Sequence, residues 1–495
     1  MTQLPAHPMP HPTPDDLRAD RAVPPGNLLR RNPTITAHEH KHQRARSRRR
    51  FLRNVGAGVA MLATGARAAA TGLTATVRNP LLRTPLALLI DDSCPVINLG
   101  WHWIKARHDW RRRLHPGTEA SGWERLHERL GTMESTVPAD FAREWGEWCG
   151  EQGIRGKFSM VPFPAGVGRI DQNFPGHPER ELREWLRVTR EIIQPNFDLT
   201  PEVMTHTGVV DLKTWKLTDA WEQYEWVDPP VEPLTDYLAA AMQLLQNAGL
   251  ACDGMTSPGA FGKKKEEAYA RAVLDASMRV TGNTRPFYFV WVRAEENPET
   301  PLWHVDKAQG RAIASVMPGT GDWFGGSGYD PSEPDKFITE DLEHGRVPKL
   351  LQQELPTILL GHWPCFFANG APGFNTLKIV KRRLDAFDPD RTRTLWMKTS
   401  DIGRYEMAKK LSDITITPGA KSDEAGISIV TKFPTTNFTL TLSREAKRLR
   451  LGGKDLCEVK SLRDFNRDSF LVKGGCTHLA FDLAEGTTAL HATFA

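Results

Sequence analysis

Between residues 86 and 411 the sequence alternates short apolar segments with longer amphipathic ones, and this alternation limits the fold more than any other feature. The apolar segments are expected to be strands, at 86–90, 155–161, 202–206, 251–256, 287–292, 312–317, 357–361 and 394–397. Helical spacing of apolar residues predicts helices at 138–152, 178–193, 234–248, 263–280 and 374–387. Strands and helices in this order predict a mostly parallel sheet covered by helices. Over about 325 residues, such a sheet is expected to close into a (β/α)7–8 barrel.

After residue 412 the spacing of apolar residues changes to two. The alternating residues are Ile414, Ile416, Ile427, Ile429, Phe438, Leu440 and Leu442. This spacing is typical of antiparallel strands with one buried face. We therefore expect an α/β barrel over 71–411 and a small antiparallel β domain, sandwich-like, over 412–495.

The N-terminal segment carries an unusual share of the positive charge. Residues 1–70 contain 12 basic and 4 acidic residues, whereas the remaining 425 contain 52 and 56. A body with a net charge of −4 argues against nucleic-acid binding, which needs a basic surface. No apolar run approaches the roughly 18 residues of a membrane span. The six cysteines include no C-x-x-C pair, which excludes a cysteine zinc ribbon.

Residues 47–53 read S-R-R-R-F-L-R, and a weakly apolar stretch over 55–63 follows. Small residues around Ala66 and Ala68 then offer a cleavage site. This layout resembles a twin-arginine export signal. The resemblance implies a leader and signal peptide over 1–70, the twin-arginine translocase as a partner, and a periplasmic or extracellular location. The protein would stay tethered to the membrane if the signal were not cleaved, and the alternative is a basic tail that binds anions.

Reactive side chains follow several of the expected strands. Asp91 and Asp92 end the first strand, His206 ends the third, and His362 ends the seventh. In a barrel the carboxyl ends of the strands gather at one mouth. Two adjacent acids at the end of an apolar strand are costly unless they cap a helix or serve a function, so we expect a functional site here.

The order of these motifs resembles that of the polysaccharide deacetylases, which are metal-dependent carbohydrate esterases with a (β/α)7 barrel. The similarity spans roughly 86–405 and consists of Asp-Asp, His-Thr, Pro-Gly and Ile-Leu-Leu-x-His. The resemblance implies that Asp91 is the general base and His362 the general acid. It also implies that Asp92 and His206 bind a divalent ion, with zinc as the expected metal.

The chain departs from the family pattern at two places. The family has a second histidine four residues after the first, and here that position is Val210. Asp211 follows it and is the candidate third ligand, which would favour a harder metal; His102 is another candidate. The loop of Ser257, Pro258 and Gly259, expected to contact substrate, has Ser257 where the family usually has an arginine.

Fifteen tryptophans suit a protein that binds sugars, because an indole face packs on the apolar face of a pyranose. Trp101, Trp323 and Trp363 are expected in loops near the site, where they would contact substrate. Together with the export signal, the resemblance implies an exported metal-dependent hydrolase that removes N- or O-acyl groups from a carbohydrate polymer or oligosaccharide.

Two other functions stay open. One is a glycoside hydrolase or lyase on the same barrel, whose two carboxyls would be Asp91 or Asp92 with Asp211 or Asp322. The other is a non-catalytic carbohydrate-binding protein that keeps the barrel without a complete metal site.

Overall fold

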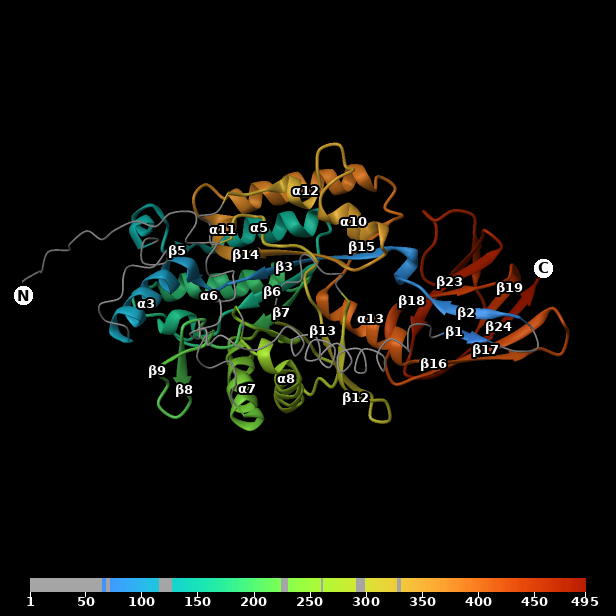
Figure 1. Cartoon of the computed structure of the whole chain (residues 1–495), viewed down its shortest axis with the longest axis horizontal. Coiled ribbons are helices and arrows are strands. Elements are labelled where there is room, and N and C mark those ends of the chain that lie inside the picture. Colours follow the sequence, from blue (N-terminus) through green and yellow to red (C-terminus); the bar gives the residue numbers. More distant parts are fainter. Residues whose placement is uncertain are drawn as a thin grey trace, which may run out of the picture.

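The computed structural model of the 495-residue chain describes residues 65–67, 72–114, 127–223, 230–259, 261–290, 299–326 and 331–495. Most of the expected leader lies outside these ranges. Figure 1 shows an α/β part, which carries the helices, and a β part formed mainly by the C-terminal residues.

The central sheet of the α/β part is built around β3 (Thr84–Asp91), all eight residues of which are buried. Strand β14 (Thr357–His362) lies parallel to it on one side, and β6 (Gly156–Met160) is its parallel partner on the other. Beyond β6 comes β7 (Phe197–Pro201), and β15 (Thr394–Trp396) pairs with the start of β3. Such continuous burial is typical of a parallel strand covered on both faces.

A second sheet contains β10 (Met255–Thr256), β11 (Phe287–Phe289) and β13 (Arg311–Ser315), with β12 (Leu302–Asp306) antiparallel at its edge. A parallel bridge between Glu202 and Thr256 connects β7 with β10. The fold is therefore mixed α/β with several sheets, and the closed barrel stays a prediction.

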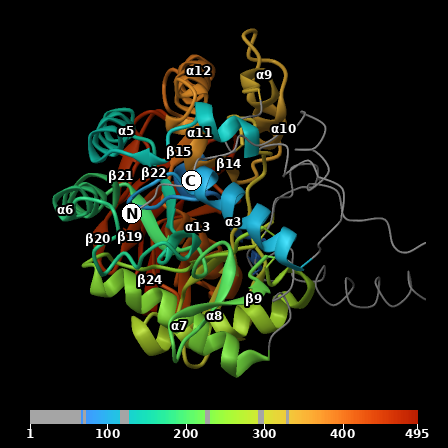
Figure 2. The ribbon, with the colours of Figure 1, turned by 90° about the vertical axis from the view of Figure 1, so that its left-hand side faces the viewer.

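Five helices lie within a few residues of the predicted segments, whereas the helices over 99–114 and 399–411 were not predicted. The main ones are α3 (Leu99–Leu114), α5 (Ala139–Glu151), α6 (Glu179–Val188), α7 (Val231–Asn247), α8 (Glu266–Val280), α12 (Pro372–Phe387) and α13 (Thr399–Leu411). Shorter elements are β4 (Val96–Ile97), β5 (Thr136–Val137), β8 (Gly208–Asp211), β9 (Lys216–Trp221), α9 (Pro334–Phe337), α10 (Arg346–Gln352) and α11 (Trp363–Phe367). In Figure 2, α3 and β9 lie toward the viewer and α7 and α8 lie below them.

The third expected strand, 202–206, is not a strand. Strand β7 instead ends at Pro201, and the chain then turns through left-handed conformations at Val203 (φ 42°) and His206 (φ 62°). Sequence patterning missed β7 because Asp198 and Pro201 are both unfavourable residues for a strand. The consequence is that Glu202 and His206 belong to a turn at the end of β7.

The β part contains two sheets. Their orders are β1-β2-β18-β23-β22-β21 and β16-β17-β24-β19-β20. The strands are β1 (Gly65–Arg67), β2 (Thr74–Val77), β16 (Asp413–Pro418), β17 (Glu424–Thr431), β18 (Thr435–Leu442), β19 (Ala446–Leu451), β20 (Lys454–Asp455), β21 (Cys457–Val459), β22 (Ser469–Lys473), β23 (Cys476–Leu483) and β24 (Gly486–Phe494). Pairing is antiparallel except between β21 and β22. Strand β2 precedes the α/β part in sequence, yet it pairs with β18 of the C-terminal segment (Figure 1).

Alternate residues of β3 pack into two different cores. Leu86, Leu88 and Ile90 pack with the aromatic side chains of the covering helices. Ala87 and Leu89 belong to the second core, which also takes in residues of the β part. By the same alternation, Asp91 shares the face of Leu89.

Strand β6 lies very close to β3. A Cβ added at Gly156 would sit 1.9 Å from the backbone oxygen of Leu88, so this position requires glycine. The close pairing fixes the register of the following residues of β6, including Lys157, against the end of β3.

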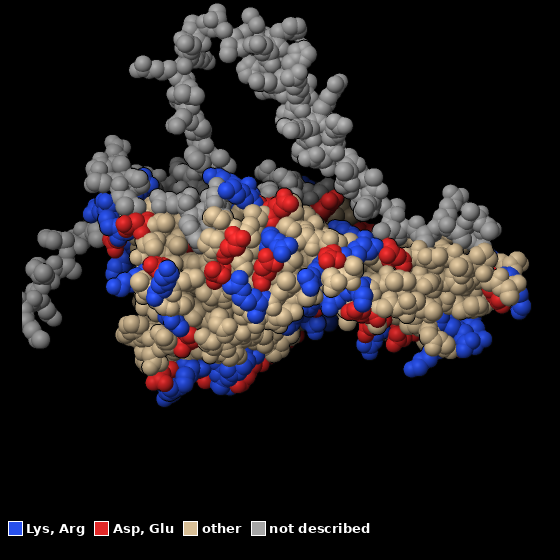
Figure 3. Space-filling model, turned by 90° about the horizontal axis from the view of Figure 1, so that it is seen from below, with Lys and Arg blue, Asp and Glu red and all other residues tan. Residues whose placement is uncertain are grey.

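Two further observations concern membrane-spanning helices and the charged side chains on the surface. No helix in the described ranges is both long and apolar enough to cross a bilayer. On the face drawn in Figure 3, basic and acidic side chains are interspersed.

Candidate metal and catalytic site

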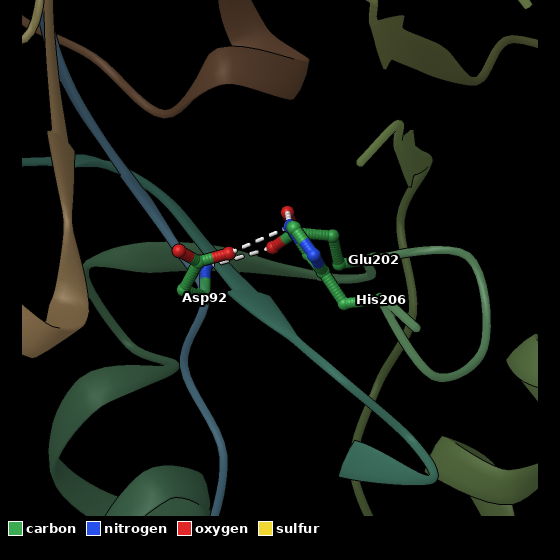
Figure 4. Close-up of side chains that lie close together, drawn as sticks. All are labelled: Asp92, Glu202 and His206. Carbon is green, nitrogen blue, oxygen red and sulfur yellow. Dashed lines mark hydrogen bonds and ion pairs between the residues drawn. The ribbon is translucent and has the colours of Figure 1, made fainter. Parts of the chain in front are cut away.

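Asp92, Glu202 and His206 converge just beyond the carboxyl ends of β3 and β7 (Figure 4). Nε2 of His206 lies 2.9 Å from Oδ1 of Asp92 and 3.2 Å from Oε1 of Glu202. One ligand atom from each residue lies within 4.8 Å of the other two. Two carboxylates and one imidazole in this arrangement can hold a divalent ion.

The backbone at two of these residues is strained. Asp92 and His206 both have left-handed conformations, with φ of 63° and 62°. Such conformations persist only where the surroundings hold them, and they concentrate at functional sites. Here the Asp92 amide donates to Oε2 of Glu202 at 2.8 Å, and the His206 amide donates to Oε2 of Glu222 at 2.7 Å.

A second carboxylate, Glu222, braces the turn that carries His206. It accepts hydrogen bonds from the backbone amides of Thr205 and His206 and from the hydroxyl of Tyr237. Burial raises the pKa of Glu222 to about 7 against these donors. Glu222 therefore positions the turn and does not itself face the candidate ion.

The three residues fit a metal ion by their chemistry. Oδ1 of Asp92 is buried and accepts no hydrogen bond of ordinary geometry from the described residues, although Nε2 of His206 is close. Counting Asp91 as well, three carboxylates, two of them buried and that of Asp92 only 14% exposed, stand against one buried ammonium, that of Lys157. A divalent cation would offset the two remaining negative charges.

Protonation in the absence of an ion follows the same electrostatics. Burial favours the neutral form of His206, but the carboxylates of Asp92 and Glu202 outweigh it and raise its pKa well above the ordinary value. Burial likewise disfavours the charged form of Asp92, yet His206 brings its pKa below the usual value. Without an ion, the proton on His206 thus offsets part of the negative charge of Asp92 and Glu202.

Asp91 is paired with a lysine. Nζ of Lys157, a completely buried residue, bonds to Oδ1 of Asp91 and to the hydroxyl of Thr256, the latter at 2.8 Å. Burial raises the pKa of the Asp91 carboxyl, and the Lys157 ammonium opposes this shift. Asp91 is thus held beside the cluster of Asp92, Glu202 and His206, with one oxygen engaged by Lys157.

His362 lies opposite Asp91, because β14 and β3 pair in a register that matches these two residues. Its Nδ1 is 2.6 Å from Oδ2 of Asp322. Burial would lower the pKa of His362, but Asp322, with Asp92 and Asp91 nearby, raises it to about 10. With 32% of its side chain exposed, His362 can present a proton to a molecule in the site.

Two of the candidate ligands from the sequence lie outside the cluster. Asp211 is exposed at the end of β8, where its carboxylate accepts a hydrogen bond from the amide of Lys213. His102 lies on α3 and is not in the group, and burial lowers its pKa to about 4. Glu202, and not Asp211, is the third member of the group with Asp92 and His206.

The residues predicted to contact substrate differ in accessibility. Trp363 is completely buried among aromatic side chains such as Phe158 and Trp145, so its indole is not available to a sugar. Trp101 and Trp323 are partly exposed.

In the Pro-Gly loop, Ser257 and Pro258 are buried and Gly259 is exposed in a left-handed conformation (φ 53°). A Cβ at Gly259 would approach the Gln223 amide to 3.2 Å. Nε2 of Gln223 in turn lies 3.1 Å from Nδ1 of His206. The loop is therefore close to a candidate metal ligand.

Sequence reasoning missed two residues of this site. Glu202 stands four residues before His206, whereas the family pattern directs attention to the residues that follow the histidine. Lys157 was inside an expected strand, where a charged residue with no local partner is itself a signal, because buried lysines are almost always paired.

Comparisons with known proteins identify no family for this chain. No family model and no curated protein matches the chain. One similar solved structure is described, only provisionally, as a glycoside hydrolase/deacetylase from Parabacteroides distasonis; it is 10% identical, with 73% of this chain and 81% of that chain covered and a TM-score of 0.35. Another is an endo-β1,6-glucanase, 10% identical, with coverage of 85% and 93% and a TM-score of 0.28. Likeness at this level carries no argument, so the functional case depends on the side chains.

Proposed function

We propose that this protein is a metal-dependent hydrolase that removes N- or O-acyl groups from a carbohydrate. The observation that carries the proposal is the convergence of Asp92, Glu202 and His206 beside Asp91 and His362.

Asp92, Glu202 and His206 would hold the divalent ion, with zinc as the expected metal. A bound divalent ion lowers the pKa of water and polarises the carbonyl of the acyl group. In this proposal Asp91 takes the proton from the attacking water. Its oxygen that is not bonded to Lys157 is the one available for this role.

In this proposal His362 donates a proton to the leaving amine or alcohol. The Asp322 carboxylate binds Nδ1 and is the main charge that raises the pKa of His362. In this proposal Nε2 carries the proton that is donated. General acid or base catalysis of this kind is typically worth 10²–10⁴-fold in rate.

A glycosidase is less well supported. Of the carboxyls that could act as a pair, Asp211 is exposed on β8, Asp322 is engaged by His362, and Asp91 is engaged by Lys157. We therefore favour the hydrolase of acyl groups over the glycosidase. The group of three candidate metal ligands favours it over the non-catalytic carbohydrate-binding protein.

Two further features of the sequence prediction belong to this proposal. The first is that the parallel strands close into a barrel, which is supported by the bridge from Glu202 to Thr256 and by the Gly319 amide donating to the Ile358 carbonyl at 3.1 Å. An experimental structure in which β13 and β14 lie apart would contradict it. The second is export by the twin-arginine route, supported by the motif at 47–53.

Metal content and acetate release test the function. The full chain, purified without chelator, should contain about one divalent ion and release acetate from an acetylated chitooligosaccharide or an acetylated xylan. Asp92→Ala should lose the ion and the activity, because it removes one of only three expected protein ligands.

The matched control is Asp211→Asn. This carboxylate lies outside the cluster, so the variant should keep both the ion and the activity. Absence of an ion from the wild-type protein, or its persistence in Asp92→Ala, would refute the proposed metal site.

A further inference from the structure

We propose that Lys157 is a positioning residue that keeps Asp91 off the metal ion and so reserves it for proton transfer. This inference depends on the proposed function, since it concerns the same ion. Two carboxylates adjacent in sequence, Asp91 and Asp92, compete for one cation, and Lys157 decides which of them can bind it.

The contacts of Lys157 support this role. It lies on β6 with no exposed surface, and its ammonium bonds to Asp91 and to the Thr256 hydroxyl. The Thr256 hydroxyl is in turn 2.8 Å from that of Thr200, and the ammonium lies 5.1 Å from the centre of the Phe289 ring. An ammonium held from several sides fixes Asp91 in one place.

Strand β6 separates the tasks of the two neighbouring acids. Lys157 holds Asp91, whereas Ser159, two residues along on the same face, donates to Oε2 of Glu202 at 2.6 Å. The same Glu202 oxygen accepts the amide of Asp92. One strand thus tethers the expected base with a cation and orients an expected metal ligand with a hydroxyl.

Replacement of Lys157 is expected to change metal affinity and activity in opposite directions. In Lys157→Met the Asp91 carboxylate loses its ammonium partner, and the neighbouring metal ion is then a cation that it can bind. Metal affinity should therefore rise by about tenfold or more, because an ammonium no longer offsets the Coulomb attraction between the Asp91 carboxylate and the ion. Activity should fall, because a carboxylate bound to the ion no longer accepts a proton. A residue that only supported the fold would, when replaced, weaken both.

The experiment measures the dissociation constant of Zn²⁺ by competition with a chromophoric chelator, together with kcat and KM for 4-nitrophenyl acetate. Lys157→Met should bind Zn²⁺ more tightly and lose at least tenfold in kcat. Lys381→Met is the control, because Lys381 is also a buried lysine paired with an aspartate, Asp385, but lies on α12. It should change neither quantity. Unchanged or weaker Zn²⁺ binding by a folded Lys157→Met would overturn the inference.

A second pair of variants guards against misfolding of Lys157→Met. Asp91→Asn leaves Lys157 as an unpaired cation and should weaken Zn²⁺ binding. The double variant Asp91→Asn with Lys157→Met removes both charges and should return to within a few-fold of the wild type. If the double variant stays as weak as Asp91→Asn, Asp91 is itself a ligand and the inference is wrong. Failure of the wild type to bind Zn²⁺ would instead refute the proposed function.

Discussion

Asp198 is a buried carboxyl whose charge is unfavourable in the folded protein. It accepts hydrogen bonds from the amide and the hydroxyl of Ser400, at 2.6 and 2.9 Å. Burial, together with the nearby Asp253, raises its pKa to about 7 from an ordinary value of 3.8. Because the folded pKa is the higher one, the folded state binds a proton that the unfolded state releases. This residue should therefore reduce the free energy of unfolding as the pH rises from about 4 to 7.

Asp198→Asn should remove that dependence. An amide can accept from the Ser400 amide and donate to its hydroxyl, so both contacts can be kept. Denaturant unfolding in EDTA across pH 4–8 should give a flatter curve for the variant, with a difference on the order of 1–3 kcal/mol between the two ends. If the wild-type and variant curves run parallel, the Asp198 carboxyl does not have a raised pKa.

Single residues also show where sequence reasoning stopped. Asp91, Asp92, His206 and His362 were predicted as site residues because they end expected strands. The structure brings all four close together. Glu202 was missed because a turn, and not a helix or strand, brings it to His206. A turn held by two left-handed residues and by the distant Glu222 leaves no periodic signal in the sequence.

Among the elements, β2 is the one whose partner lies farthest away in sequence. It pairs with β18, and its buried side chains are Ala75 and Val77. Strand β1 pairs with the other side of β2 and forms the edge of the sheet. A protein that begins at residue 71 loses only β1, whereas one that begins at residue 78 exposes the edge of β18.

The truncation at 71 should leave thermal stability within a few degrees of the full chain. The truncation at 78 should lose about 3–5 kcal/mol, because it also removes the buried Leu73 and uncovers apolar surface. Calorimetry of both proteins checks this. Equal stability of the two would show that β2 contributes nothing to the sheet.

Element prediction succeeded where the pattern is local. The helices over 138–152 and 374–387 were expected within two residues of α5 and α12, because their apolar faces repeat at helical spacing. Strand β2 could not be predicted, since T-A-T-V is too short to show a period and its partner is more than 350 residues away. The barrel is undecided for a related reason, because the pairing of short strands such as β10 depends on tertiary contacts.

At the scale of the whole molecule, the cysteines bear on how the protein would reach its destination. All six are free, and Cys94, Cys149, Cys252 and Cys365 are buried. A fold without disulfides is compatible with folding in a reducing compartment. The candidate metal ligands have 14% or less of each side chain exposed, so we expect an ion to be acquired as the chain folds. Both properties suit a protein that folds, and takes up its metal, before export.

The twin-arginine interpretation makes a specific prediction from this. In a bacterium with the translocase, the wild-type protein should appear in the periplasmic fraction. The double substitution Arg48→Lys and Arg49→Lys should hold it in the cytoplasm, because the paired guanidinium groups are the signal. The retained protein should still bind about one ion per chain, since folding precedes transport. A retained variant that is unfolded and metal-free would mean that folding depends on the periplasm, and unchanged export of the variant would mean that another signal directs it.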